Sequence, residues 1–166
     1  MFSIFNVSVG GTDYFGLGVN PYNSDYPSQK NFTDDEGYPS TNIKFIDFEL
    51  DPGSTSEGST KIYIDDIRSG YLTYGDKSKN QIGFYTTKDI NAASTFHVFI
   101  LEGGAITLYD EATPLAVIME SVPVKDKKTN KTVDLKYVLM LGDKYNQIVH
   151  FHVDGFTKEE KKAISQ

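Results

Sequence analysis

The most constraining feature of this sequence is a short pattern that occurs three times at nearly equal intervals. Each copy has an apolar residue, two variable positions, phenylalanine, another variable position, leucine or valine, and an acidic residue. The phenylalanines are Phe48, Phe99 and Phe151, which are 51 and 52 residues apart. Three copies at near-constant spacing predict a fold built from three equivalent units.

A second pattern, an alternating apolar run followed by a turn, precedes each of these phenylalanines. It occurs over residues 4–15, 62–72 and 106–115. The order is therefore a strand pair first and the phenylalanine strand last. We expect one domain over residues 1–156, with units of about 1–51, 52–103 and 104–156, and a short charged tail over 157–166. Residues Thr157–Ser165 of this tail are the only helical candidate.

The chain as a whole has the composition and period of an all-β protein. It contains 11 Tyr, 11 Phe and 14 Gly but no Trp, and aromatic side chains favour pleated, half-buried surfaces. Apolar residues alternate in short runs between turn residues, which is typical of a sandwich or barrel. We expect two long loops, Asn20–Thr41 and Ser121–Val133, and a short strand near Asn31–Phe32. The other expected strands are Ser3–Val9, Tyr14–Val19, Ile43–Leu50, Lys61–Asp65, Tyr71–Tyr74, Ile82–Thr86, Phe96–Leu101, Ala105–Tyr109, Leu115–Glu120, Leu135–Leu141 and Ile148–Asp154.

These repeats resemble the ricin-B-like β-trefoil superfamily, in which each unit ends in Gln-x-Trp-x-Ile/Val. Phe48, Phe99 and Phe151 are similar to the tryptophan of that motif, and the following Leu50, Leu101 and Val153 to its aliphatic residue. The motif is degenerate, because Ile46, His97 and Val149 replace the glutamine. The resemblance implies a β-trefoil: three pseudo-repeats of four strands that form a six-stranded barrel capped by three hairpins. Three such units bury together an apolar face that none buries alone.

Composition and spacing argue against catalysis, metal binding and nucleic-acid binding. There is no cysteine, so no thiolate nucleophile or Cys-based metal site exists. His150 and His152 flank Phe151 on one strand, but no third metal ligand is suitably spaced, and we predict no metal and no cofactor. We interpret the adjacent acids Asp34–Glu36 as a solvated loop and Asp65–Asp66 as a turn that follows a strand, not as carboxylates that face each other across a cleft. No Gly-x-Ser-x-Gly elbow is present, and a net charge of −7 argues against nucleic acid.

The sequence also gives an expectation for location and partners. The N-terminal segment has no basic region followed by an apolar run, and no stretch is long and apolar enough to insert into a membrane. With no cysteine, the chain is expected to be cytoplasmic. We expect a binding protein that recognises a protein or a glycan through its loops, where Tyr22, Tyr26 and Tyr38 provide aromatic side chains.

The leading hypothesis for function is protease inhibition. Signal-less, cysteine-free β-trefoils of this length resemble the mycocypins, whose first hairpin loop carries Gly-Gly ahead of a tyrosine. Here Gly10 and Gly11 precede Tyr14, and the resemblance implies that they enter a protease cleft. Arg68, in a second turn, is a candidate for the acidic pocket of a trypsin-like enzyme. An ordinary hairpin turn at Gly10–Gly11 is the simpler alternative.

Two alternatives remain open. In a lectin of the ricin-B type, Tyr85 matches the aromatic residue that stacks on the sugar, and Tyr74, Asp76 and Asn91 lie nearby in sequence. Thr73 stands where the sugar-binding acid would be, so the usual site is incomplete. The third possibility is a structural protein of a virion or other assembly, for which the sequence offers no interface signature.

Overall fold

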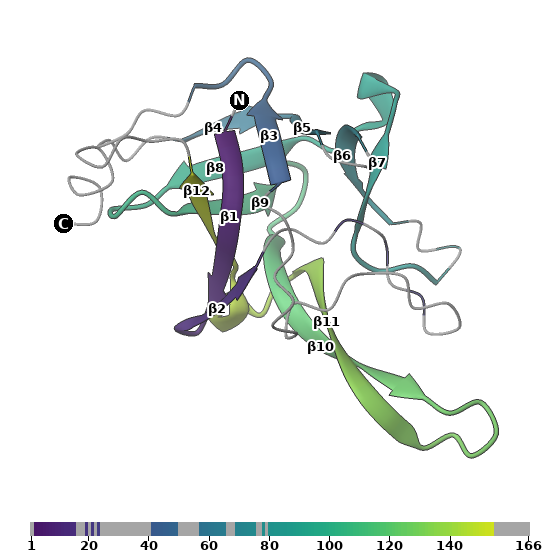
Figure 1. Ribbon diagram of the computed structural model, residues 1–166. Helices are drawn as coiled ribbons and strands as arrows, with labels where there is room; N and C mark the ends of the chain where they lie inside the picture. The colour runs from purple at the N-terminus through teal and green to yellow at the C-terminus, as the bar shows by residue number, and fades with distance from the viewer. Residues whose placement is uncertain are drawn as a thin grey trace.

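The computed structural model describes residues 2–15, 19, 21, 23, 41–49, 57–65, 69–75, 78 and 80–154. Over these residues the fold is all-β, with no α-helix, which confirms the predicted class (Figure 1). The short 3-10 helices η2 (Ile90–Ala92) and η3 (Tyr145–Gln147) lie between strands. The strands are β1 (Phe2–Val9), β2 (Thr12–Phe15), β3 (Thr41–Phe45), β4 (Glu57–Thr60), β5 (Ile62–Asp65), β6 (Gly70–Tyr74), β7 (Phe84–Thr87), β8 (Phe96–Ile100), β9 (Ile106–Asp110), β10 (Ala116–Lys125), β11 (Thr132–Gly142) and β12 (His150–Asp154).

These strands form one antiparallel sheet that curls into a half-barrel. The longest path of paired neighbours runs β11-β10-β9-β12-β1-β3-β5-β6-β7, and β8 lies off this path, paired with both β4 and β9. Strand β1 is central, because it pairs with β12, β2 and β3. The first and last strands of the described chain therefore lie side by side.

Strands β4 and β5 form one stretch of chain that changes partner at Lys61. Before Lys61, β4 pairs with β8; after it, β5 pairs with β3. The bend is held by hydrogen bonds on both sides: the Ile46 N–H donates to the Lys61 carbonyl at 2.9 Å, and the Thr60 hydroxyl lies 2.8 Å from the Ile46 carbonyl oxygen. Lys61 Nζ donates to the carbonyl of Ala93 at 2.8 Å. A single strand thus connects two parts of the sheet.

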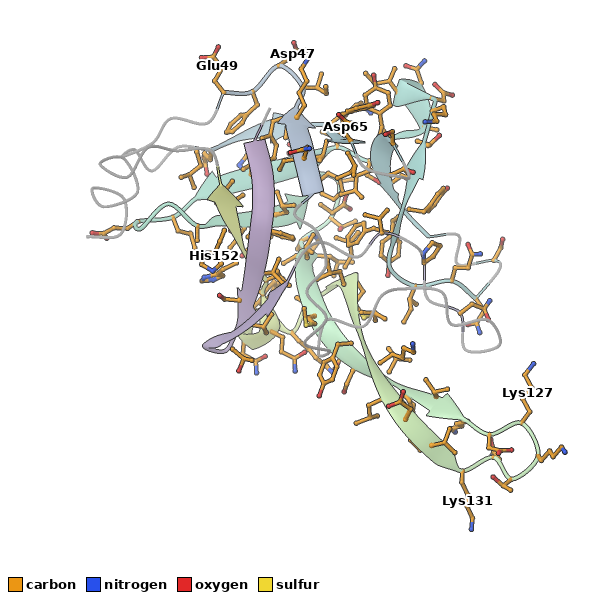
Figure 2. All side chains as sticks on the ribbon, viewed as in Figure 1. Asp47, Glu49, Asp65, Lys127, Lys131 and His152 are labelled. Atoms are coloured by element: carbon orange, nitrogen blue, oxygen red, sulfur yellow. The ribbon has the colours of Figure 1, made fainter. Side chains whose placement is uncertain are left out.

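Strands β10 and β11 extend well beyond the core as a two-stranded arm, whose tip carries Lys127 and Lys131 (Figures 1 and 2). The expected long loop Ser121–Val133 is wrong, because β10 continues to Lys125 and β11 begins at Thr132. The proline and lysines suggested a loop, but Pro123 is accommodated opposite Leu135 in the ladder. The true connection is the short turn over residues 126–131.

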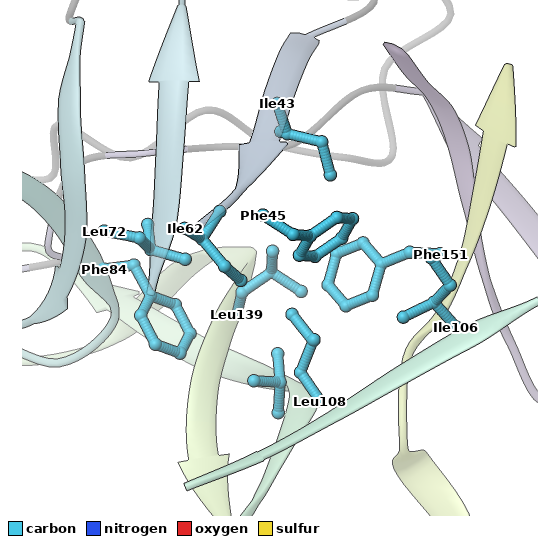
Figure 3. Close-up of a pocket in the computed structure, with 10 residues that line it drawn as sticks. Ile43, Phe45, Ile62, Leu72, Phe84, Ile106, Leu108, Leu139 and Phe151 are labelled. Carbon is cyan, nitrogen blue, oxygen red and sulfur yellow. The ribbon is translucent and has the colours of Figure 1, made fainter. Parts of the chain in front are cut away.

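Several strands give one face to the core, whereas β9 and the first part of β10 are buried at successive residues. In β8, Phe96, Val98 and Ile100 are buried and His97 and Phe99 are not, as expected when successive side chains point to opposite faces. Ten apolar residues surround a small central void of about 20 Å³ (Figure 3). They are Ile43, Phe45, Ile62, Leu72, Phe84, Ile106, Leu108, Val117, Leu139 and Phe151.

Most predicted strands are present within a few residues of their expected limits, and the differences have local causes. The strand expected over Ile43–Leu50 ends at Phe45, because a turn follows in which Asp47 has φ of 56°. Strand β4 was not predicted, since Glu57-Gly58-Ser59-Thr60 lacks the apolar alternation of a strand. The tail Thr157–Ser165, the strand near Asn31–Phe32 and most of Asn20–Thr41 lie outside the described residues.

Candidate functional site

The candidate site is an open cavity of about 390 Å³ beside the β1–β2 turn. Strands β1, β9 and β12 and the helix η3 contribute to its wall, so segments distant in sequence meet there. The lining residues are Ser8, Gly10, Gly11, Leu101, Thr107, Tyr109, Tyr145, Asn146, Ile148 and His150. This volume falls in the range of pockets that hold small molecules.

Gly10 and Gly11 form the two-residue turn of the β1–β2 hairpin. Val9 pairs with Thr12, and the glycines have φ of 57° and 84°. Positive φ at both central residues is the requirement of a type I′ turn, which glycine meets without a steric penalty. A Cβ at either position would find no atom within 4 Å, and both residues are exposed. The turn therefore leaves open space at the mouth of the cavity.

Tyr145 and Tyr109 form an aromatic wall of the cavity. Their rings are stacked, with centroids 6.4 Å apart and an interplanar angle of 27°. The Tyr145 hydroxyl donates to the carbonyl of Pro114 at 2.5 Å, and Tyr109 packs edge-on against Phe99 at 5.2 Å. Tyr145 is nevertheless 49% exposed. One tyrosine ring is thus held in place while part of its surface remains accessible.

The polar groups of the cavity are neutral side chains and one histidine. Asn146 and His150 are exposed, and Thr107 is buried in β9. The Ser8 hydroxyl lies 2.6 Å from His152 Nε2, which holds β1 against β12 at the cavity edge (Figure 2). No carboxylate, lysine or arginine belongs to the described lining. This wall can stack against a ring and exchange hydrogen bonds, but it holds no facing pair of carboxylates for acid–base chemistry.

A second polar cluster lies at the ends of β4, β8 and β9. It adjoins a row of aromatic rings formed by Phe99, Tyr109 and Tyr145. His97 Nε2 is 3.5 Å from Glu57 Oε2, and its Nδ1 is 3.2 Å from Glu111 Oε2. The Ser59 hydroxyl donates to the same Glu111 oxygen at 2.7 Å. This hydrogen bond, and then the hydrogen bond and charge of His97, hold the pKa of Glu111 below its ordinary value of 4.5. His97 packs on Phe99 at 4.7 Å, so the cluster adjoins the aromatic row that leads to Tyr145.

The predicted binding residues are distributed over different parts of the molecule. Gly10 and Gly11 line the cavity, whereas Arg68 and Asp76 lie outside the described residues, as do Tyr22, Tyr26 and Tyr38. Tyr74 packs edge-on against Phe84 at 5.4 Å, and burial raises the pKa of its hydroxyl against the opposing effect of hydrogen bonds to the backbone of Gly83 and Leu141.

The other two predicted lectin residues, Tyr85 and Asn91, are exposed on the surface. Tyr85 is 36% exposed on β7, paired with Thr73, whose hydroxyl approaches the Ala92 carbonyl at 3.3 Å. Asn91 is exposed in η2, which follows Asp89 as its N-cap. Tyr85 and the Asn91 segment thus adjoin the same Thr73, but neither residue lines the cavity at Gly10–Gly11.

Sequence reasoning missed Tyr109, Tyr145 and Asn146. Tyr109 belongs to the second repeated pattern, where its alternation indicates a strand residue and nothing more. Tyr145 and Asn146 lie in a polar stretch whose only local signal is a turn. His150 stands out in the sequence only as one half of a His-x-His pair on a predicted strand. Over the chain that the structure describes, no group of three or more His, Asp or Glu is arranged to hold a metal ion.

The chain matches no protein-family model, and no curated protein or solved structure is significantly similar to it. Within the described residues, neither helix has the length and apolar character needed to span a membrane.

Proposed function

We propose that this protein is a non-enzymatic carbohydrate-binding protein of β-trefoil architecture, whose ligand occupies the cavity between Gly10–Gly11 and Tyr145. The observation that carries this proposal is the Tyr145–Tyr109 stack at the wall of an open cavity of about 390 Å³. Sugar rings present apolar C–H faces and a rim of hydroxyl groups. An immobilised aromatic ring beside neutral hydrogen-bonding side chains suits both parts of such a ligand.

The order of strand pairing supports the β-trefoil part of the proposal. Pairing leads from β1 to β3 and β5, along the same chain through Lys61 to β4, and then through β8, β9 and β12 back to β1. A circuit of six strands, with β4 and β5 counted as one bent strand, has the connectivity of a small barrel. The hairpins β6–β7 and β10–β11 attach to this circuit through β5 and β9.

The chemistry of the wall indicates a neutral ligand. Asn146 offers both a donor and an acceptor, and Thr107 and Ser8 offer hydroxyls. Because the described lining has no arginine or lysine, a phosphate or carboxylate would have no permanently charged partner there. We therefore infer that the ligand is an uncharged saccharide. The absence of cysteine suits a reducing compartment, where such a protein would meet intracellular glycans.

Replacing Tyr145 tests the proposal, because its ring is the exposed member of the stack. On an array of neutral and charged glycans, we expect wild-type protein to bind a set of neutral structures and Tyr145→Ala to lose that binding. Tyr85→Ala is the matched control, since it removes an exposed tyrosine that does not belong to the cavity lining and should retain binding. Loss of binding in Tyr85→Ala alone would move the site to the second unit, and an array without any hits would contradict carbohydrate recognition.

Protease inhibition is the second candidate, favoured by the exposure of the Gly10–Gly11 turn and the open space around it. A main chain without side chains can lie flat in a protease cleft. Titration of papain-like and trypsin-like enzymes tests this candidate. Gly10→Asn keeps a residue that tolerates the turn geometry while adding a side chain, so it should weaken inhibition without unfolding the hairpin. If wild-type protein inhibits neither class of enzyme, this candidate fails.

A further inference from the structure

The arm formed by residues 121–137 differs from the rest of the sheet. The first four residues of β10, Ala116–Met119, are all buried, whereas exposed and half-buried positions alternate from Glu120 onward. Beyond Glu120 the two strands therefore leave the core, and Figure 1 shows them projecting away from the other strands. A ribbon that leaves the core presents both of its faces to whatever surrounds the molecule.

The tip of the arm is a rigid, basic turn. Asp126 accepts the backbone N–H groups of Lys128 and Thr129 through Oδ1 at 2.7 and 3.2 Å, and its carbonyl accepts that of Asn130 at 2.8 Å. Its own N–H donates to the Lys131 carbonyl at 2.9 Å. The turn thus fixes the backbone that carries Lys125, Lys127, Lys128 and Lys131, all of them exposed.

Behind this tip the arm exposes apolar side chains. Val133 is 64% exposed and Leu135 is 46% exposed, and the exposed Pro123 lies directly opposite Leu135. Cross-strand partners share one face of a ribbon, so Pro123 and Leu135 form a small apolar surface next to the lysines. A surface with an apolar centre and a charged rim is typical of a protein–protein contact.

The opposite end of the molecule is acidic. Asp47, Glu49 and Asp65 are exposed on and beside β3 and β5, and Figure 2 shows them at the end of the molecule distant from Lys127 and Lys131. Among the residues that the structure describes there, Lys44 on β3 is an exposed cation, and the exposed Lys88 donates from Nζ to the carbonyl of Ser69, whose hydroxyl donates to Asp65. Over the sequence, residues 125–136 hold five lysines and two aspartates, a net charge of +3, so the remainder carries −10 of the total −7.

We propose that the arm is a self-association element that docks onto the acidic end of a second copy of this chain. The lysines at the tip face the carboxylates beside β3 and β5, and the Pro123–Leu135 surface becomes covered. Because the two contacting surfaces are different, the contact is head-to-tail and generates a ring or an open chain rather than a twofold dimer. This inference is independent of carbohydrate binding, since neither surface includes the cavity.

Charge reversal in two places gives a direct test. Lys128→Glu/Lys131→Glu makes the tip acidic, and Glu49→Lys/Asp65→Lys makes the far end basic; Asp47 is kept because its φ of 56° disfavours lysine. We expect the wild type to associate in sedimentation velocity as its concentration rises. Each variant alone should remain monomeric, and an equimolar mixture of the two should associate again.

The mixture controls for net charge and folding, because both variants must be folded for association to return. Leu135→Ser leaves the net charge unchanged, and we expect it to associate more weakly than the wild type. The association constant of the wild type should fall at least about tenfold when the ionic strength rises from about 10 mM to about 1 M. Over this range the screening length drops from about 30 Å to about 3 Å. A wild-type protein that stays monomeric at low ionic strength, or a mixture that does not associate, would overturn the proposal.

Discussion

Glu111 connects three strands at the surface through hydrogen bonds. It follows β9, accepts the hydroxyl of Ser59 on β4 at 2.7 Å, and lies 3.2 Å from Nδ1 of His97 on β8. Its backbone N–H also donates to the Thr95 carbonyl at 3.0 Å. The exposed carboxylate of Glu111 therefore links β4 to β8 beside the row of aromatic rings that ends at Tyr145.

The lowered pKa of Glu111 gives a pH dependence with a definite sign. A carboxyl group whose pKa is lower in the folded than in the unfolded protein stabilises the fold above its unfolded value of 4.5, and this contribution is lost as pH falls through the folded pKa. We expect Glu111→Gln to make the urea midpoint less sensitive to pH below about 4.5. Ser59→Ala, which removes the largest cause of the shift, should change the profile in the same direction. An unaltered profile in both variants would contradict this interpretation.

The three phenylalanines that reveal the repeat do not occupy equivalent positions. Phe151 is 1% exposed in the core, whereas Phe99 lies on the other face of β8 against Tyr109, and Phe48 lies beyond β3 against Phe45. In the first two units the residue three places earlier, Phe45 or Phe96, is the buried one. The spacing thus predicted three related segments, but the pattern cannot specify which aromatic ring faces inward when a turn or bulge shifts the register.

At the level of elements, the β10–β11 arm combines a buried base with an exposed end on the same two strands. Leu135 and Leu139 make the contrast clear, because they are four residues apart on β11 and on the same face. Leu139 is fully buried and lines the central void, whereas Leu135 is exposed. The stability of the domain therefore depends on the base of the hairpin and not on its tip.

This contrast predicts very different effects for one type of substitution. Leu139→Ala should lower the free energy of unfolding by about 2–5 kcal/mol, as expected for a fully buried leucine. Leu135→Ala should change it by less than about 0.5 kcal/mol, as expected on a surface. Urea titration followed by circular dichroism measures both values. At protein concentrations where the chain is monomeric, a large loss in Leu135→Ala would mean that the arm packs against another part of the same chain.

Element boundaries were predictable where apolar alternation dominates and not where backbone geometry does. Strands β8 and β9 both lie within one residue of the limits that their patterns predict. In β8 alternate residues are buried, whereas in β9 the three successive residues Ile106–Leu108 are buried. The polar strand β4 forms because it pairs with β8 over four residues. This pairing joins segments distant in the sequence, so the local sequence of β4 does not predict it. The candidate site depends on such pairings: Gly10 and Gly11 were recognisable, but Tyr145 reaches them only because β1 pairs with β12.

At the scale of the whole molecule, the three units predicted from the sequence contribute to one core. Phe45 lies in the first unit, Phe84 in the second and Leu139 in the third, and all three line the same void of about 20 Å³ (Figure 3). Strands β1 and β12, from opposite ends of the described chain, close the sheet against each other. A unit taken alone would leave its part of this surface exposed to water, so we expect folding to be a property of the whole chain.

Substitution of the second unit tests this expectation. Phe84→Ala should lower the free energy of unfolding by about 3–5 kcal/mol, because its ring is fully buried. Since the core is shared, the loss should shift a single transition, with the midpoints from circular dichroism and tyrosine fluorescence in agreement. The excised segment 52–103 should be unfolded. Two transitions, of which Phe84→Ala shifts only one, would show instead that the units fold independently and that the shared void does not couple them.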